Sequence, residues 1–109
     1  MAAPVPATFT VIRSRGPAWN PDLPMRGQPA WGAHAAFMNA LASDGVIVLG
    51  GPLGDGERTL LIVEAPSPDA VRRLLEPDPW TAMNLLRIDS ITPWHILLAR
   101  ADGRQQRPA

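Results

Sequence analysis

Residues 46–64 read VIVLGGPLGDGERTLLIVE, two apolar runs joined by a glycine-rich segment. The first run, residues 46–49, is entirely apolar, and the second, residues 58–64, is rich in leucine and β-branched residues, so each is typical of a buried strand. The linking residues 50–56 (GGPLGDG) contain four glycines and a proline, which favour a turn. This stretch predicts a β-hairpin near the middle of the chain.

An amphipathic helix is predicted on each side of the hairpin. Before it, residues 31–42 carry apolar side chains and one histidine at spacings of three and four, so they share one helical face, and Asp44 followed by Gly45 ends the helix. After it, Ser67 is an N-cap residue with proline at the next position, and the helix that it starts runs to about Glu76.

The outer segments predict two further strands. Residues 7–13 (ATFTVIR) place Phe9 and Val11 on one face, and residues 85–100 form a last strand broken near Pro93. Residues 14–29, with four prolines and two glycines, predict a long loop. The order β-α-β-β-α-β is the plan of ferredoxin-like folds, so we expect an α+β protein with an antiparallel four-stranded sheet.

Composition narrows the range of functions. The 109 residues include ten basic and ten acidic side chains and no cysteine, which leaves no net field to hold nucleic acid and excludes disulfides and thiol chemistry. No run approaches the roughly 20 apolar residues of a membrane span. We therefore expect one cytoplasmic domain over residues 7–100, with flexible ends at residues 1–6 and 101–109, and neither a nucleic-acid nor a membrane partner.

Both faces of the last two predicted strands are apolar. In the third predicted strand Leu61 and Val63 lie on one face and Leu60 and Ile62 on the other. In the last one Ile96 and Leu98 lie on one face and Leu97 and Ala99 on the other. Two helices cover one face of a four-stranded sheet, so the other face needs a different cover. A second copy of the sheet is the simplest cover and predicts a homodimer through the sheet faces. The alternative is that these side chains stay half-exposed.

His34 is the candidate acid or base. It lies on the apolar face of the first predicted helix and so points toward the sheet, where a neutral imidazole needs a partner for at least one ring nitrogen. Asp78, held between Pro77 and Pro79, is the candidate that orients it. The alternatives are a core histidine with satisfied hydrogen bonds and an aspartate that only caps the turn beginning at Pro79.

Five other residues are candidates for contact with a ligand. Arg13, or alternatively Arg15, near the end of the first strand, is suited to hold an anionic group. Trp31 and Trp80 flank the candidate pair in sequence and are suited to wall an apolar cleft for a flat ring, although tryptophans are more commonly core or dimer-contact residues. Gly51 and Pro52 would let a ligand approach the backbone closely, if they are not simply part of the turn.

The motifs together resemble a known family. In order and spacing, the sequence over about residues 7–99 is similar to the YciI-like (YCII-related) family, in residues 32–37, 44–53, 67–70, 78–79 and 91–94. The resemblance implies a ferredoxin-like monomer that pairs sheet to sheet as a dimeric α/β barrel. It also implies an acid–base pair in a cleft, which corresponds here to His34 and Asp78. The loop over residues 14–29 is longer than in the family pattern.

The resulting hypothesis is a cofactor-independent enzyme in which His34, oriented by Asp78, moves a proton on a small cyclic or unsaturated molecule by lyase or isomerase chemistry. The alternative is a module that binds or senses a small molecule in the same cleft without turnover. His95 has no His, Asp or Glu partner at metal-ligand spacing, so neither a metal site nor another cofactor is predicted.

Overall fold

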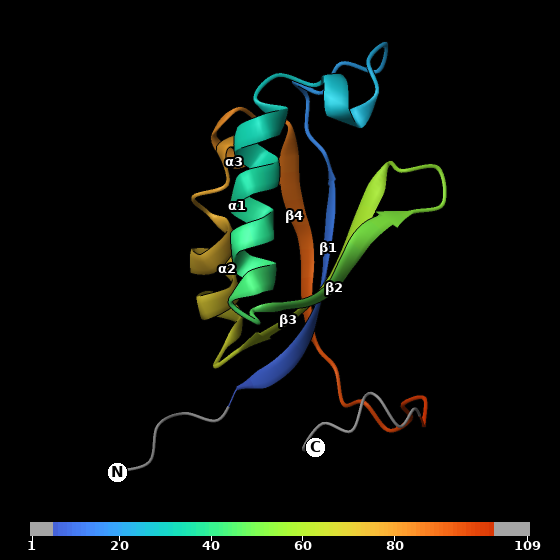
Figure 1. Ribbon diagram of the computed structural model, residues 1–109, viewed down its shortest axis with the longest axis vertical. Helices are drawn as coiled ribbons and strands as arrows, with labels where there is room; N and C mark the ends of the chain where they lie inside the picture. Colours follow the sequence, from blue (N-terminus) through green and yellow to red (C-terminus); the bar gives the residue numbers. More distant parts are fainter. Residues whose placement is uncertain (1–5, 102–109) are drawn as a thin grey trace.

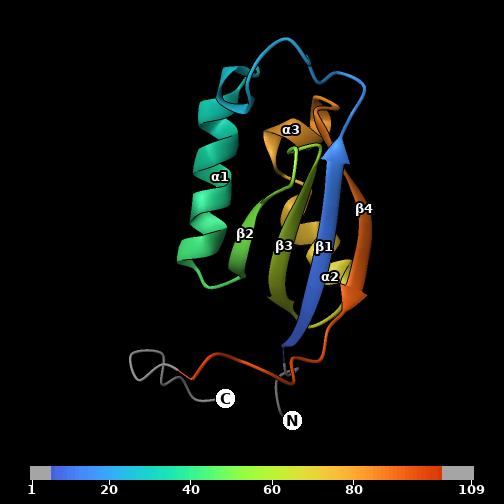
Figure 2. The ribbon, with the colours of Figure 1, turned by 90° about the vertical axis from the view of Figure 1, so that its right-hand side faces the viewer.

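A four-stranded antiparallel sheet carries the helices on one face (Figures 1 and 2). The computed structural model of the chain describes residues 6–101. Its strands are β1 (Ala7–Arg15), β2 (Ile47–Leu53), β3 (Arg58–Ala65) and β4 (Leu86–Pro93), and its α-helices are α1 (Trp31–Ser43), α2 (Pro68–Leu75) and α3 (Pro79–Ala82). The predicted α+β class and the predicted order of strands and main helices are confirmed, with α3 as an additional short helix.

β1 lies in the interior of the sheet, whose strand order is β2-β3-β1-β4. Val11 stands opposite Leu61 of β3 and Ile91 of β4, so hydrogen bonds on both sides hold β1 in register. A register shift against β4 occurs between Ile12 and Arg13. The carboxyl end of β1 is therefore held in a fixed position close to α3, and this end carries Arg13.

The main core lies between the sheet and α2. Alternate residues of β1 and β3 point to the same side, and there they meet the buried face of α2. The buried members of this cluster are Phe9, Val11, Ile47, Leu61, Val63, Ala65, Val71 and Leu75. Each large side chain of this kind stabilises the fold by about 1.5–3 kcal/mol when it leaves water. A second cluster, made of Trp80 of α3 with Leu85 and Leu86, packs against Trp19 and Trp31.

Two N-caps fix where the helices after β3 begin. The Ser67 hydroxyl accepts a hydrogen bond from the Ala70 N–H at 3.1 Å, as its place before Pro68 predicts. The Asp78 carboxylate accepts one from the Trp80 N–H at 3.0 Å, and Pro79 occupies the first turn of α3. Asp78 therefore has the capping role expected from its sequence neighbours, whatever other contacts it makes.

The predicted turn at residues 50–56 is partly wrong. β2 continues to Leu53, with Gly51 opposite Leu60 and Pro52 opposite Thr59, and the turn occupies residues 54–57. Proline is tolerated here because β2 is an edge strand and its outer side needs no hydrogen-bond partner. The apolar run at residues 46–49 therefore marks only the first half of the strand.

The predicted last strand is too long. β4 ends at Pro93, opposite Phe9, and the hydrogen bond from the Trp94 N–H to the Thr8 carbonyl at 2.8 Å is the last contact of this ladder. β1 itself starts at Ala7, so later residues find no strand opposite them. Leu97 and Leu98 are 89% and 91% exposed. They do not belong to the sheet, and their alternation says nothing about its two faces.

Two further expectations concern the ends of the chain and membranes. The flexible ends predicted at residues 1–6 and 101–109 fall almost entirely outside the described residues. Over residues 6–101, no helix has the length and apolar character needed to cross a bilayer.

Gly16 and Gly32 form a matched pair for testing the packing at the end of β1. A methyl group on Gly16 would overlap the Asn84 carbonyl, whereas one on Gly32, in the first turn of α1, would meet nothing within 4 Å. We expect Gly16→Ala to lower the free energy of unfolding by about 1–3 kcal/mol through overpacking. Gly32→Ala should be neutral or stabilising by up to about 1 kcal/mol. Urea unfolding of both variants checks this, and equal effects would contradict it.

Candidate active site

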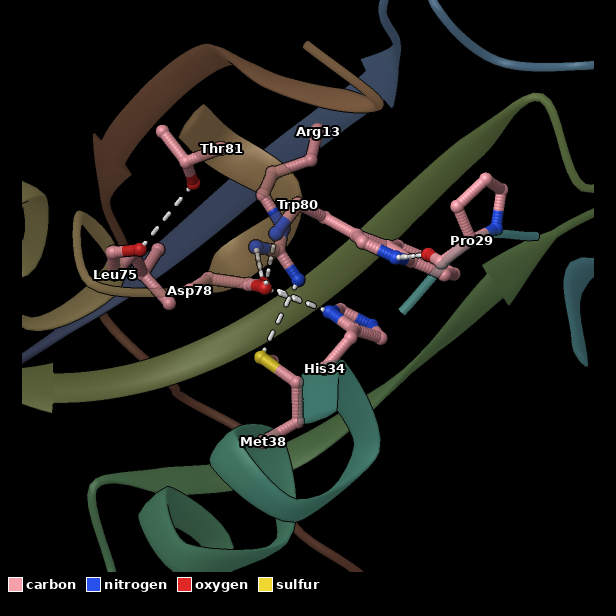
Figure 3. A network of polar contacts seen from close by, with 8 residues as sticks. All are labelled: Arg13, Pro29, His34, Met38, Leu75, Asp78, Trp80 and Thr81. Carbon is pink, nitrogen blue, oxygen red and sulfur yellow. Dashed lines mark hydrogen bonds and ion pairs between the residues drawn. The ribbon is translucent and has the colours of Figure 1, made fainter. Parts of the chain in front are cut away.

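The Asp78 carboxylate is the centre of a buried polar network (Figure 3). Asp78 is fully buried, and its two oxygens accept hydrogen bonds from three groups. Arg13 Nη1 donates to Oδ2 at 2.9 Å, the Trp80 N–H donates to Oδ1 at 3.0 Å, and His34 Nδ1 lies 2.9 Å from each oxygen. Residues 13, 34 and 78 are thus joined through a single carboxylate.

Each member is positioned by a different element. Arg13 lies near the end of the interior strand β1, and Asp78 is the N-cap of α3. His34 is in the first turn of α1, where its N–H donates to the Ala30 carbonyl at 3.0 Å. Regular backbone therefore supports Arg13 and His34, and Asp78 is fixed by its capping bond at the start of α3, which is more precise than support from mobile loops.

The two ring nitrogens of His34 differ, because Nδ1 is hydrogen-bonded to Asp78 and Nε2 is not bonded to any residue that the structure describes. An ionised carboxylate only accepts hydrogen bonds, so Nδ1 carries the proton and, in the neutral ring, Nε2 keeps its lone pair. Within residues 6–101, Nε2 has no hydrogen-bond partner, and it is not among the fully buried polar atoms that lack one. Nε2 therefore retains some access to solvent at the edge of a pocket that His34 lines.

Trp80 locks the imidazole from the side. Its indole ring is stacked on the His34 ring, with 3.8 Å between the centroids and 6° between the planes. The indole N–H donates to the Pro29 carbonyl at 2.6 Å, so the ring cannot rotate away without losing this hydrogen bond. The orientation of His34 is therefore set by Asp78 at Nδ1 and by Trp80 on one ring face.

The environment keeps Asp78 ionised. Burial alone raises the pKa of a carboxyl group, but the hydrogen bonds from His34, the Trp80 N–H and Arg13 outweigh burial and hold the pKa of Asp78 below its usual range. Burial also lowers the pKa of Arg13, an effect that its bond to Asp78 opposes. A guanidinium titrates so far above neutrality that Arg13 stays charged. The site thus contains a buried, mutually compensating ion pair.

A pocket of about 540 Å³ lies beside this network, between α1 and the strands β1–β3. Its walls are mainly apolar, with few polar groups, as in most small-molecule sites. Aromatic residues gather at the end nearest His34, where Trp80 lies 5.5 Å from Trp19 and 5.7 Å from Trp31 between ring centroids. The geometry suits a flat molecule that lies against indole rings.

The pocket brings together most of the residues singled out in the sequence. Its lining includes His34 and all five predicted ligand contacts, namely Arg13, Trp31, Gly51, Pro52 and Trp80. Asp78 does not line the pocket itself and lies behind three lining residues, since it is bonded to Arg13, His34 and the Trp80 N–H. Arg13 is oriented differently from the expectation, since its Nη1 donates to Asp78. His95 is exposed on the segment after β4, apart from this site.

Residues of the long loop also line the pocket. Trp19 and Met25 line the pocket, together with Arg15 at the end of β1, whose guanidinium lies 4.8 Å from the centre of the Trp19 ring. The number of tryptophans was the available signal for Trp19. Arg15 was the alternative to Arg13 for holding an anionic group, and it lies in the pocket as well.

Gln28 gives the loop its shape and was missed in the sequence. Its amide nitrogen donates to the carbonyls of Asn20 at 2.7 Å and Leu23 at 3.0 Å, and its amide oxygen accepts from the Asn20 N–H at 3.0 Å. Gln28 as a whole is 3% exposed. These bonds close residues 20–28 on themselves, so the proline-rich segment is an ordered wall of the pocket.

Comparison with known proteins gives the family. A model of the YCII-related domain matches residues 14–95. The chain belongs to the YCII-related family. The resemblance noted in the sequence is thereby confirmed, and this YCII-related protein contains the family's domain over most of its length. No curated protein matches the chain.

A solved structure is also similar to this YCII-related protein. It is the 5-chloro-2-hydroxyhydroquinone dehydrochlorinase TftG from Burkholderia phenoliruptrix AC1100, in complex with 2,5-dihydroxybenzoquinone. The sequences are 26% identical, the TM-score is 0.56, and the match covers 82% of this chain and 92% of the dehydrochlorinase chain. The two proteins share the ferredoxin-like arrangement over nearly the whole of the relative.

The ion pair predicts how stability depends on pH. Because the pKa of Asp78 is lower in the folded than in the unfolded chain, its contribution is present above the unfolded value of about 3.9 and is lost as pH falls through the folded value. Asp78→Asn should cost about 3–5 kcal/mol near neutrality by leaving Arg13 unpaired.

Urea unfolding of wild type and Asp78→Asn from pH 7 down to pH 3 measures this effect. The difference between them should narrow as the pH falls below about 4. Asp69→Asn, a change at an exposed position of α2, serves as the control. A difference in the free energy of unfolding between wild type and Asp78→Asn that stays constant from pH 7 to pH 3 would contradict the lowered pKa of Asp78.

Proposed function

We propose that this protein is a cofactor-independent enzyme that removes a proton from a small, flat, hydroxylated ring compound, in a reaction of the lyase or isomerase type. The observation that carries the proposal is the state of His34. Its Nδ1 is held by Asp78 at 2.9 Å, while Nε2 has no partner within the described chain and His34 lines the pocket. A neutral imidazole placed in this way is a general base near neutral pH.

Each residue has a distinct role in this proposal. His34 accepts the substrate proton at Nε2. Asp78 fixes the tautomer and stabilises the imidazolium that forms, as the orienting carboxylate does in other base–carboxylate pairs. Trp80 limits rotation of the imidazole by stacking on it at 3.8 Å.

The proposed substrate class follows from the walls of the pocket and from the structural relative. Three tryptophans offer flat apolar surfaces, and about 540 Å³ is ample for a single substituted ring. The relative is named for removing hydrogen chloride from a chlorinated hydroxyhydroquinone, and it is bound to 2,5-dihydroxybenzoquinone. At 26% identity its chemistry supports a related reaction here, with a leaving group still to be determined.

The elimination can be written for a halogenated ring substrate. In the keto tautomer of such a ring the halogen stands on a saturated carbon. A proton from an enol O–H conjugated with that carbon, or from a C–H next to it, passes to His34 Nε2. The electrons of the broken bond form a new double bond, directly or through the conjugated system, and the halide leaves with its bonding pair. The imidazolium then returns the proton to water. An isomerase would use the same first step and return the proton to another atom of the substrate.

We expect wild-type protein in D2O to exchange a ring proton of a halogenated hydroxyhydroquinone for deuterium, or to release chloride from it. Proton NMR measures the exchange and a chloride assay measures the release. His34→Gln should reduce the rate by about 10²–10⁴-fold, the usual contribution of a general base. His95→Gln, at an exposed position outside the pocket, should keep the wild-type rate.

A binding module would give a different result. In that case 2,5-dihydroxybenzoquinone would quench the tryptophan fluorescence while neither exchange nor chloride release occurred for any compound tested. That outcome would contradict the enzyme hypothesis and favour a module that senses or sequesters the ring compound. Equal rates in wild type and His34→Gln would remove His34 from the reaction.

We also propose that the protein works as a homodimer that pairs through the open face of its sheet. Phe9 and Val11 point to the helices, so Thr10 and Ile12 point to the opposite face, where Ile12 stands beside Leu60 of β3. Ile12 and Leu60 are half-buried in the single chain, and no helix within residues 6–101 lies over this face (Figure 2). Apolar surface on a sheet of this kind favours cover by a second sheet.

Leu60→Glu is expected to abolish this pairing, because it places a charge in the middle of the apolar interface. Light scattering coupled to gel filtration should give twice the chain mass for wild type and the single chain mass for the variant. Met83→Glu, at a 38% exposed apolar position next to α3, should stay dimeric. A wild type that is monomeric at micromolar concentration would rule out the dimer.

A further inference from the structure

Arg13 is buried against the same carboxylate that holds His34. Its side chain is 3% exposed, and its Nη1 lies 2.9 Å from Asp78 Oδ2. Its Nη2 contacts the Met38 sulfur at 3.4 Å, a weak acceptor, and its Nε has no partner among the described residues. The strong bond of this guanidinium is therefore the one to Asp78, and its charge is concentrated beside the acid–base pair.

We propose that Arg13 is a positioning residue that keeps His34 an uncharged base at neutral pH, by balancing the charge of Asp78. The role in catalysis rests on the proposed function, but the effect on His34 does not require turnover. A buried carboxylate with an imidazole as its sole neighbour favours the imidazolium, which has no lone pair to accept a proton. Because the positive charge of Arg13 already compensates the carboxylate, His34 does not have to be protonated to do so.

The charges around His34 are few. The charged side chains around it are Arg13 and Arg15 of β1, Asp55 of the turn after β2, and Asp78 at the cap of α3. Arg26, in the short helix Met25–Gly27, faces Trp31 instead, with 6.0 Å between its guanidinium carbon and the ring centre. Arg15 and Asp55 line the same pocket with opposite charges, and the pKa of Asp55 is held low chiefly by the Glu57 N–H and also by Arg15. The net charge next to the His34 ring is thus set by Arg13 and Asp78.

This arrangement also suits the charge that the reaction creates. Before proton transfer, Arg13 and Asp78 compensate each other and both His34 and the substrate O–H or C–H are neutral. After transfer, the three side chains together carry one positive charge, at the moment when the substrate carries one negative charge. A pair of only His34 and Asp78 would then be neutral overall and would hold the anion less strongly.

The test is the titration of the His34 ring, followed by NMR of its carbon-bound protons. The chain contains two histidines, so all variants are made in a His95→Gln background in which His34 is the single histidine. We expect Arg13→Met to raise the His34 titration midpoint by about one pH unit or more, a roughly tenfold gain in proton affinity. Arg13→Lys, which restores a positive charge, should recover most of the original midpoint.

A charge-balanced variant keeps the test decisive if Arg13→Met does not fold. Asp78→Asn alone should lower the His34 midpoint, and the double variant Arg13→Met with Asp78→Asn should return it close to the wild-type value, because both charges are removed together. The step from Asp78→Asn to the double variant then measures Arg13 directly. A midpoint that fails to rise when Arg13 is replaced, in either background, would overturn the proposal.

Activity separates this inference from the proposed function. If a ring substrate is turned over, the acidic limb of the pH profile of kcat/KM should move with the NMR midpoint in Arg13→Met, a change that simple loss of packing would not produce. If the midpoint shifts as expected and no compound is turned over, Arg13 still controls the protonation of His34 and only the enzymatic role fails.

Discussion

The buried Asp78 carboxylate is the constraint on which the rest of the site depends. A fully buried negative charge persists only where hydrogen bonds and a counter-charge replace the water that it has lost. Three separate elements meet this requirement, the interior strand through Arg13, α1 through His34 and α3 through the Trp80 N–H. One carboxylate therefore links parts of the chain that are up to 65 residues apart, and any relative motion of these elements would weaken several bonds together.

The pocket exists because the two main helices use the sheet differently. α2 presses Val71 and Leu75 into the main core, whereas α1 has His34 as its buried residue and leaves a pocket between itself and β1–β3. Met38 and Leu41 of α1 reach the core cluster only partly. Close packing of both helices would have stabilised the fold further, but it would have removed the space beside His34.

The sequence predicts the fold well because alternation in β1 and β3, helical spacing in α1 and α2, and the Ser67 cap are local signals that tertiary packing leaves unchanged. It predicts β2 and β4 poorly because strand length depends on the neighbouring strand: Pro52 is accepted at an edge, and Leu97 has no strand to pair with. His34 and Asp78 were identifiable from helical face and proline frame. The partnership of Arg13 with Asp78 was not, because it depends on the register between β1 and α3.

The ordered loop has a consequence for how this fold diversifies. Gln28 ties the loop to its own backbone, and the Pro29 carbonyl joins it to Trp80, so few of its hydrogen bonds involve the sheet. A segment that is held largely by its own hydrogen bonds can change in length, and can exchange a wall residue such as Trp19, while Arg13, His34 and Asp78 keep their places on β1, on α1 and at the cap of α3. The loop wall of the pocket and the polar network beside it are thereby encoded in separable stretches of the sequence.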